Sequence, residues 1–301
     1  MPLFTIHQGG AKELGERPFK LEKDIQKVFE DNLDTFMGLR LVKSEFTVKN
    51  RRIDTLAFDP DANAFVIIEY KRDKNNSVVD QGIAYLNLML DNKAEFIVEY
   101  NESLQANLTR SEVDWSQTRV AFVASSFTEN QKQATNFKDL AIELWEVKRF
   151  ENSTLLVNVV RKAASAPSIK QLAPQSESLA QVSKEIKEYT EKDHYEGSSE
   201  EMVELYERFK EAILNLGDNL DIKPKKKEIG FTHSGKIFTD ICLLRNSLKI
   251  WINLKRGQLD DPRNIAEDVS STGHWGNGDY QIKVSDDKHL EYIMSLVKQS
   301  L

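Results

Sequence analysis

Apolar residues in the first half of the chain repeat with two different spacings. Those between 19 and 33 recur every three or four residues, which is typical of an amphipathic helix that buries one side. Those between 41 and 72 form short β-type runs broken by turn residues, which predicts a meander of strands. Strands and helices then alternate, which indicates an α/β domain with a mixed central sheet. The predicted elements are helices at 19–33, 78–90 and 129–137, and strands at 41–48, 51–59, 64–72, 94–100, 118–125, 142–148 and 154–160.

The composition changes near residue 163. The segment 163–190 begins rich in Ala, Ser, Pro and Gln, which is typical of a linker, and a helical repeat of apolar residues follows within it. The rest predicts a small α+β unit with helices at 200–217 and 286–301, and strands at 228–233, 236–244, 247–254 and 280–284. The 301 residues are therefore expected to form two domains, 1–162 and 191–301, joined by a linker with a connecting helix.

Charged residues interrupt two of the apolar strands. Side chains alternate along a strand, so Glu69 and Lys71 are expected on the same face as Phe65 and Ile67. A charge left there is costly unless it is paired or bound to a metal. Asp54 would lie alongside on the preceding strand. Two carboxylates and a lysine at one strand end offer the oxygen ligands that Mg²⁺ prefers. The simpler alternative is a structural salt bridge between Lys71 and one of the acids.

These residues form an Asp…Glu-x-Lys pattern, and the first half of the chain resembles the PD-(D/E)xK nuclease superfamily, which has the restriction-endonuclease fold. Gln81 and Tyr85 match a Gln-x-x-x-Tyr pattern of its RecB-like branch. The resemblance implies a restriction-endonuclease-like mixed sheet flanked by helices, and a nuclease that hydrolyses phosphodiester bonds in DNA. It also implies that Lys71 positions a water and polarises the phosphate, while Gln81 and Tyr85 orient Lys71 or a neighbouring phosphate.

The resemblance implies a metal site as well, for Mg²⁺ or Mn²⁺. Its ligands would be the carboxylates of Asp54 and Glu69, helped by the carbonyl of Tyr70. Glu22 opens the first predicted helix, where the family often has an acid, and is expected to assist them. Glu30, at the other end of the same helix, is a weaker rival for that role.

The overall charge favours a different class of function. The chain has a net charge of −7, whereas nucleic-acid-binding domains are usually basic. Arg51, Arg52, Arg72 and Lys74 flank the proposed site and could form a local basic face. The alternative is a non-enzymatic protein that binds nucleic acid or a partner on a nuclease-like fold. The complete Asp…Glu-x-Lys pattern argues against that alternative.

Other features bear on the compartment and the partners. Cys242 is the only cysteine, so no disulfide within the chain is expected, and the N-terminus lacks the pattern of a signal peptide. No apolar run approaches the length of a membrane span. We therefore expect a cytoplasmic protein with DNA as its partner and no membrane association. A homodimer is a further expectation, since cutting two strands often calls for two sites.

The C-terminal half also has a resemblance. Residues 259–284 resemble a small domain of unknown function that accompanies such nuclease-like domains, in a family sometimes labelled a predicted transport protein. His274 and Trp275 stand between glycines, where an aromatic ring could stack on a base. The simpler interpretation is a tight loop with Trp275 in the core. Lys225, Lys226 and Lys227 are expected to form a solvated loop.

Overall fold

The computed structural model describes residues 2–7, 9–72, 77–163, 165–172, 174, 176–233, 235–272 and 276–301. The chain divides into two compact units, Met1–Glu188 and Tyr189–Leu301. Each unit has its own sheet and its own hydrophobic core. Within the described residues, no helix is long and apolar enough to cross a membrane.

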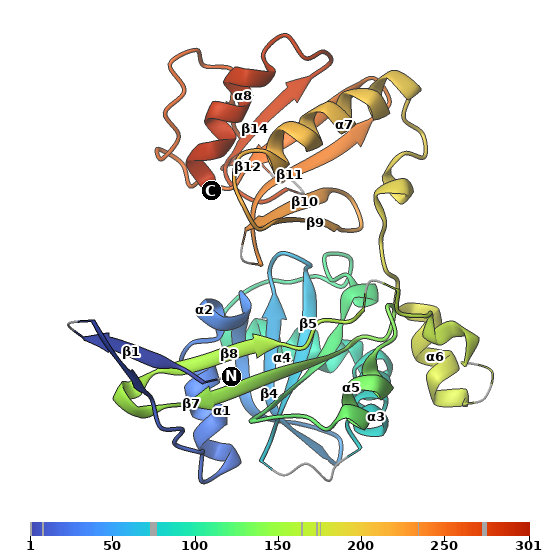
Figure 1. Ribbon diagram of the computed structural model, residues 1–301. Coiled ribbons are helices and arrows are strands. Elements are labelled where there is room, and N and C mark those ends of the chain that lie inside the picture. The colour runs from blue at the N-terminus through green and yellow to red at the C-terminus, as the bar shows by residue number, and fades with distance from the viewer. Residues whose placement is uncertain are drawn as a thin grey trace. The chain divides into compact units, whose positions relative to one another are not determined.

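The first unit is built on a six-stranded mixed sheet with its strands in chain order (Figure 1). The strands are β3 (Arg40–Val48), β4 (Arg51–Asp59), β5 (Ala64–Lys71), β6 (Arg119–Ala124), β7 (Ile142–Arg149) and β8 (Leu155–Val159). The first three form the predicted antiparallel meander, because short turns join them. The next two run parallel to β5, and β8 returns antiparallel. The inner strand β6 is buried almost throughout, as its continuous apolar sequence predicts.

Helices cover both faces of this sheet. The helix α1 (Glu22–Glu30) packs its stripe of Ile25 and Phe29 against the face of β5 that carries Val66 and Ile68. The helices α3 (Val78–Asp91) and α4 (Lys93–Leu104) pack against the opposite face, which carries Phe65. This confirms the predicted class, a mixed sheet flanked by helices with a second, small α+β unit.

The strand predicted at 94–100 is wrong, because these residues lie within α4. The short apolar run Phe96-Ile97-Val98 favoured a strand. In the structure Phe96 and Tyr100, four residues apart, are buried together, while Val98 is 52% exposed. That is helical spacing, and the tertiary packing overrides the strand preference of the β-branched residues.

Several shorter elements complete the first unit. They are the hairpin β1 (Phe4–His7) and β2 (Gly10–Glu13), and the helices α2 (Leu33–Met37) and α5 (Glu129–Thr135). The segment expected as a linker contains α6 (Glu177–Glu185), which packs on α3 through Leu179 and Val182. Turns of 3-10 helix lie at Trp115–Gln117, Glu151–Ser153 and Ile169–Gln171 in this unit, and at Glu191–His194 and Lys298–Ser300 in the second.

The second unit is a six-stranded antiparallel sheet with two helices on one face. Its strand order is β13-β14-β12-β11-β10-β9. The apolar faces of α7 and α8 pack with the alternate residues Leu248, Ile250 and Ile252 of β12. The element bounds are α7 (Glu200–Leu214), β9 (Leu220–Pro224), β10 (Ile229–His233), β11 (Lys236–Leu244), β12 (Ser247–Ile252), β13 (Glu267–Asp268), β14 (Tyr280–Val284) and α8 (Leu290–Val297). The predicted C-terminal helix is thus shorter than the apolar pattern suggested.

Candidate active site

The site begins with a break in the alternation of β3 and β4. Glu45 has a φ of 55°, in the left-handed region, so residues two apart on β3 face opposite ways. Ser44 accepts a hydrogen bond from α1, whereas Phe46 packs in the core on the other side. On β4, Thr55 likewise contacts α1 and Ile53 packs on the other side. Asp54 lies at this change of face.

The pairing of β4 with β5 ends at the same point. Its last pair of residues is Thr55 and Ile68. Beyond that pair, side chains replace the backbone ladder. The amide of Tyr70 donates to Asp54 Oδ2 at 3.1 Å, and the amide of Asp54 donates to Glu69 Oε1 at 3.3 Å. Each carboxylate therefore bridges the gap between the parting strands, and the two acids are held close together.

The remaining residues of the predicted site converge on Glu69. Lys71 Nζ lies 3.3 Å from Glu69 Oε2, and Gln81 Nε2 donates to the same oxygen at 3.2 Å. Gln81 Nε2 also lies 3.3 Å from the Tyr85 hydroxyl, which donates to the carbonyl of Arg52. The helix α3 thus ties the carboxylate to the start of β4.

A glycine lets α3 come this close. A Cβ added at Gly82 would lie 2.4 Å from Ile142 Cδ1 and 3.3 Å from Phe122, which leaves no room for a larger residue. Gly82 follows Gln81 directly and precedes Tyr85 by three positions. The close approach of the helix to the sheet is therefore what brings Gln81 and Tyr85 to the site.

The two glutamates of α1 occupy different places. Glu22 lies at the end of β5, where its Oε1 accepts the amide of Arg72 at 2.8 Å, and its charge contributes to the field at Asp54. Glu30 lies on the α1 side of the sheet, where it accepts hydrogen bonds from Gln26 at 2.9 Å and from Thr55 at 2.5 Å. Of the two, Glu22 is the one near the carboxylate pair.

Burial shapes the electrostatics of the site. It raises the pKa of Asp54, and it raises the pKa of Glu69, where repulsion from Asp54 adds to the effect. Lys71 partly opposes both shifts. Burial also raises the pKa of Tyr85 to about 12, so its hydroxyl stays protonated and can donate. The pair therefore carries more negative charge than its surroundings stabilise, and a bound cation would relieve it.

The donor set fits a hard divalent cation. It consists of the carboxylates of Asp54 and Glu69 and the backbone carbonyl of Tyr70. The N–H and C=O of a residue in a strand point to the same side, and the amide of Tyr70 donates to Asp54, so its carbonyl faces the same side. Among the residues that the structure describes, no group of three or more His, Cys, Asp or Glu side chains could enclose a metal by itself. Water or substrate would have to complete the coordination, as is usual for Mg²⁺.

A polar network behind the site escaped the sequence analysis. Gln26, only 3% exposed, donates to the carbonyl of Asp54 at 2.9 Å and contacts Ser44 and Glu30. Thr55 links Glu30 to the hydroxyl of Tyr70. The sequence offered one sign of this network. Gln26 lies directly after Ile25 and three residues before Phe29, so it borders the apolar stripe of α1 that packs on the sheet.

The flanking basic residues are partly neutralised. Arg52 and Lys23 both pair with Glu45, at 3.0 and 2.6 Å. Arg72 donates to the carbonyl of Lys20, and Lys74 lies outside the described residues. The local basic face expected from the sequence is therefore smaller than the number of its residues suggested.

The second unit contains a buried charge cluster. Lys225, expected in a solvated loop, is only 5% exposed and pairs with Glu228 at 2.9 Å and Asp240 at 3.0 Å. The amide of Asn277 donates to the other oxygen of Asp240. His274 and Trp275 lie outside the described residues. The expectation for Lys225 is wrong because the two buried acids draw its side chain inward.

Comparisons with known proteins place the chain in a family. An uncharacterized protein of Haemophilus influenzae is 53% identical over 301 residues, which is 100% of this chain and 99% of that protein. The chain belongs to the same family. Residues 191–300 also match a family described as a domain of unknown function, DUF5655. Neither match carries a described activity.

Solved structures give only remote likenesses. They include EndoMS in a complex with dsDNA, which has 16% identity and a TM-score of 0.30, and the match covers 43% of this chain and 47% of that one. A repair endonuclease from Pyrococcus abyssi has 20% identity, 44% and 50% coverage and a TM-score of 0.25. Pyrococcus furiosus SfsA in complex with Ca²⁺ has 15% identity and a TM-score of 0.23, and the match covers 52% of this chain and 74% of that one. The chain spans about half the length of the two endonucleases. The chemistry assigned below rests on this chain's own residues.

Proposed function

We propose that this protein is a divalent-metal-dependent nuclease that hydrolyses phosphodiester bonds in DNA. The observation that carries the proposal is the meeting of Asp54, Glu69 and Lys71 where β4 and β5 part. Burial raises the pKa of both acids, and only Glu69 contacts the lysine, so Asp54 lacks the ion pair that Glu69 has. A cation that binds the two carboxylates would complete it.

Each group has its own part in the proposed reaction. Asp54, Glu69 and the carbonyl of Tyr70 would hold the metal, with Glu22 beside them. A bound Mg²⁺ or Mn²⁺ supplies positive charge that stabilises the phosphate in the transition state and lowers the pKa of water. Lys71, paired with Glu69, is suited to donate hydrogen bonds to the phosphate and to the attacking water rather than to remove a proton.

The residues of α3 would act on orientation. Gln81 donates a hydrogen bond to Glu69 Oε2 at 3.2 Å and so would restrict rotation of that carboxylate. Gln81 also donates to the Tyr85 hydroxyl, which in turn donates to the carbonyl of Arg52. In hydrolysis water adds to phosphorus and loses a proton to the solvent, while the bond to the leaving oxygen breaks and that oxygen takes up a proton. The protein's contribution is the placement of charge around that centre.

The test is cleavage of a panel of single-stranded, duplex and branched DNA with Mg²⁺ or Mn²⁺. We expect cleavage by the parent and a loss of at least about 100-fold in Asp54→Asn and in Glu69→Gln, the effect of removing a group that stabilises transition-state charge. Glu95→Gln, at an exposed position on α4, is the matched control and should cleave as the parent does. Cleavage by Asp54→Asn at the parent's rate would refute the proposal.

The second candidate is a nuclease-like protein that binds nucleic acid or a partner without cutting it. The net charge of −7 and the pairing of Arg52 and Lys23 with Glu45 favour it. The same panel separates the two functions. Retained binding of DNA by the parent, without cleavage of any DNA in either metal, would support the second candidate.

A further inference from the structure

The first unit has a cavity that does not include the carboxylate pair. The cavity has a volume of about 400 Å³, within the range of pockets that hold small ligands. It lies where β6 and β7 begin, and Arg119 at the start of β6 pairs in register with Val66. Val66 lies three residues before Glu69 and five before Lys71, so the cavity is roughly 10 Å along the strand from the first and roughly 16 Å from the second.

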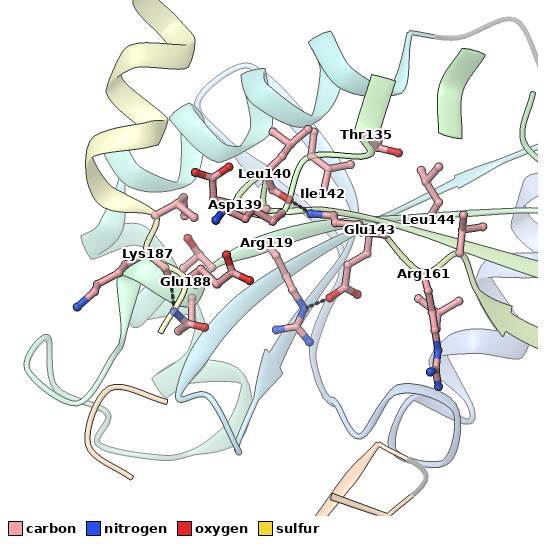
Figure 2. A pocket seen from close by; sticks show the side chains of 18 of the residues that line it. Arg119, Thr135, Asp139, Leu140, Ile142, Glu143, Leu144, Arg161, Lys187 and Glu188 are labelled. Atoms are coloured by element: carbon pink, nitrogen blue, oxygen red, sulfur yellow. Dashed lines mark hydrogen bonds and ion pairs between the residues drawn. The ribbon is translucent and has the colours of Figure 1, made fainter. Parts of the chain in front are cut away.

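Three segments distant in sequence close this cavity. They are the loop before β7, the end of β8 with the residues that follow it, and the chain after α6. Figure 2 shows Arg119 and Glu143 joined in the middle, with Lys187 and Glu188 on one side and Arg161 on the other. The charge of Arg119 is already compensated, since Arg119 forms ion pairs with Asp59 at 2.9 Å and with Glu143 at 2.8 Å.

Three further cations line the cavity, Lys138 and Arg161 at exposed positions and Lys162 at a half-buried one. Within the described part of the chain, no carboxylate forms an ion pair with Lys138, Arg161 or Lys162. The ammonium of Lys162 donates to the carbonyl of Leu140 instead. Burial lowers the pKa of Lys162, and the nearby charges of Glu143, Glu188 and Asp139 oppose this shift without cancelling it. The ammonium of Lys162 therefore still carries a desolvation cost, and an anionic ligand beside it would reduce that cost.

The lining also includes apolar, acidic and neutral polar side chains. Leu140, Ile142, Val160 and Ile186 supply aliphatic walls, and Glu188 supplies a carboxylate at the edge. Cations suit a phosphate, aliphatic walls suit the flat faces of a ring, and a carboxylate suits the hydroxyl groups of a ribose. A ligand that has all three features is a nucleotide, whereas inorganic phosphate has only the first and a sugar phosphate lacks the ring.

We infer that this cavity binds a nucleoside monophosphate, with Lys162 and Lys138 on the phosphate, the aliphatic walls on the base and Glu188 on the ribose. The inference goes beyond the proposed nuclease and does not depend on it, because no residue of the candidate active site lines the cavity. It assigns the first unit a second ligand.

Isothermal titration calorimetry of the full chain with AMP, GMP, CMP and UMP tests the inference. We expect at least one of them to bind more than tenfold tighter than ribose 5-phosphate, inorganic phosphate or the matching nucleoside. Lys162→Met should weaken that binding at least tenfold, and Lys138→Gln several-fold. Lys170→Gln, an exposed lysine eight positions further on that does not line the cavity, is the matched control.

Other outcomes are equally decisive. The inference would be overturned if none of the four nucleotides gave heat when titrated to a tenfold molar excess over the protein. It would also be overturned if Lys162→Met bound the nucleotide as tightly as the parent does, with an unchanged unfolding temperature. Equal binding of ribose 5-phosphate and of the nucleotide would overturn the assignment to a nucleotide. Glu69→Gln should bind the nucleotide as the parent does, so failure of the nuclease proposal and failure of this one are separate results.

Discussion

The two units each bring two carboxylates and one lysine together, with opposite results. In the second unit Lys225 contacts both Glu228 and Asp240, and all three are nearly inaccessible, which makes a closed ion-pair cluster. In the first unit Lys71 contacts Glu69 at the longer distance of 3.3 Å, while Asp54 bonds to the backbone of the neighbouring strand. The same residue types therefore form a structural cluster in one place and a candidate reactive site in the other.

What differs is the strand geometry around the charges. Lys225 and Glu228 lie in the connection between β9 and β10, where the amide of Lys225 donates to the carbonyl of Glu228, and Asp240 lies on β11 in register with Gly230 of β10. Asp54 and Glu69 lie where pairing stops and the strands part. In the closed cluster the lysine occupies the space between the two carboxylates, whereas Asp54 is only half-buried and lies beyond the last paired residues of β4 and β5.

The largest expected effect is on the closed cluster. Lys225→Met should lower the free energy of unfolding by about 3–5 kcal/mol, because it leaves two buried carboxylates without a cation. Thermal and urea unfolding followed by circular dichroism would measure this loss. Lys226→Met is the control, since Lys226 is exposed and adjacent, and should change stability by less than about 0.5 kcal/mol. Equal effects of the two substitutions would show that the cluster is not a structural unit.

The matching substitution in the first unit should act on rate. Lys71→Met should reduce metal-dependent cleavage of DNA about 100- to 1,000-fold, since it removes a cation aimed at the phosphate. It should lower the free energy of unfolding by less than Lys225→Met does, because only one carboxylate loses its ion pair and Glu69 keeps its bonds to Gln81 and to the Asp54 amide. A loss of stability as large as that of Lys225→Met, with cleavage retained, would reverse the comparison.

The network behind the open site should give a smaller effect. Gln26→Leu leaves the carbonyl of Asp54 without its side-chain donor and should cost about 1–3 kcal/mol of stability. Cleavage should fall as well, through kcat, because Asp54 is held less firmly. Kinetics at saturating DNA, compared with Gln133→Leu on the exposed surface of α5, would measure it. An unchanged kcat would mean that Gln26 supports only the fold.

The smallest effect concerns pH. Burial raises the pKa of Glu69 in the folded chain, so the ionised form destabilises the fold, and this penalty grows as pH rises through the folded pKa. Glu69→Gln should therefore be more stable than the parent at neutral pH, by roughly 1 kcal/mol for each unit of the shift, and should lose this advantage at acidic pH. Urea unfolding at pH 4 and pH 7.5 would measure it. A variant less stable than the parent at pH 7.5 would contradict the assigned direction.

Much of the first unit's fold follows from periodicity. The meander and the inner strand β6 were predicted within a few residues, because their apolar spacing has one interpretation. The segment 94–100 was predicted wrongly, because a short apolar run fits a strand as well as a helix. Only the partners of Phe96 and Tyr100, supplied by distant strands, distinguish the two.

The candidate site was predictable only in its residue types. Sequence spacing indicated that Glu69 and Lys71 share a face, and the structure brings Asp54, Gln81 and Tyr85 to them. The broken alternation at Glu45 could not be predicted, since a left-handed glutamate has no sequence signature. Gln26 was missed for the same reason: its importance depends on a carbonyl 28 residues away that the break leaves available.

The most direct measurement is a calorimetric titration of the full chain with Mn²⁺, for the parent and for Asp54→Asn. The account predicts saturable binding by the parent that Asp54→Asn weakens at least tenfold, while Glu95→Gln binds as the parent does. Identical isotherms for the parent and Asp54→Asn would contradict it, because the carboxylate pair would then have no part in holding a divalent ion.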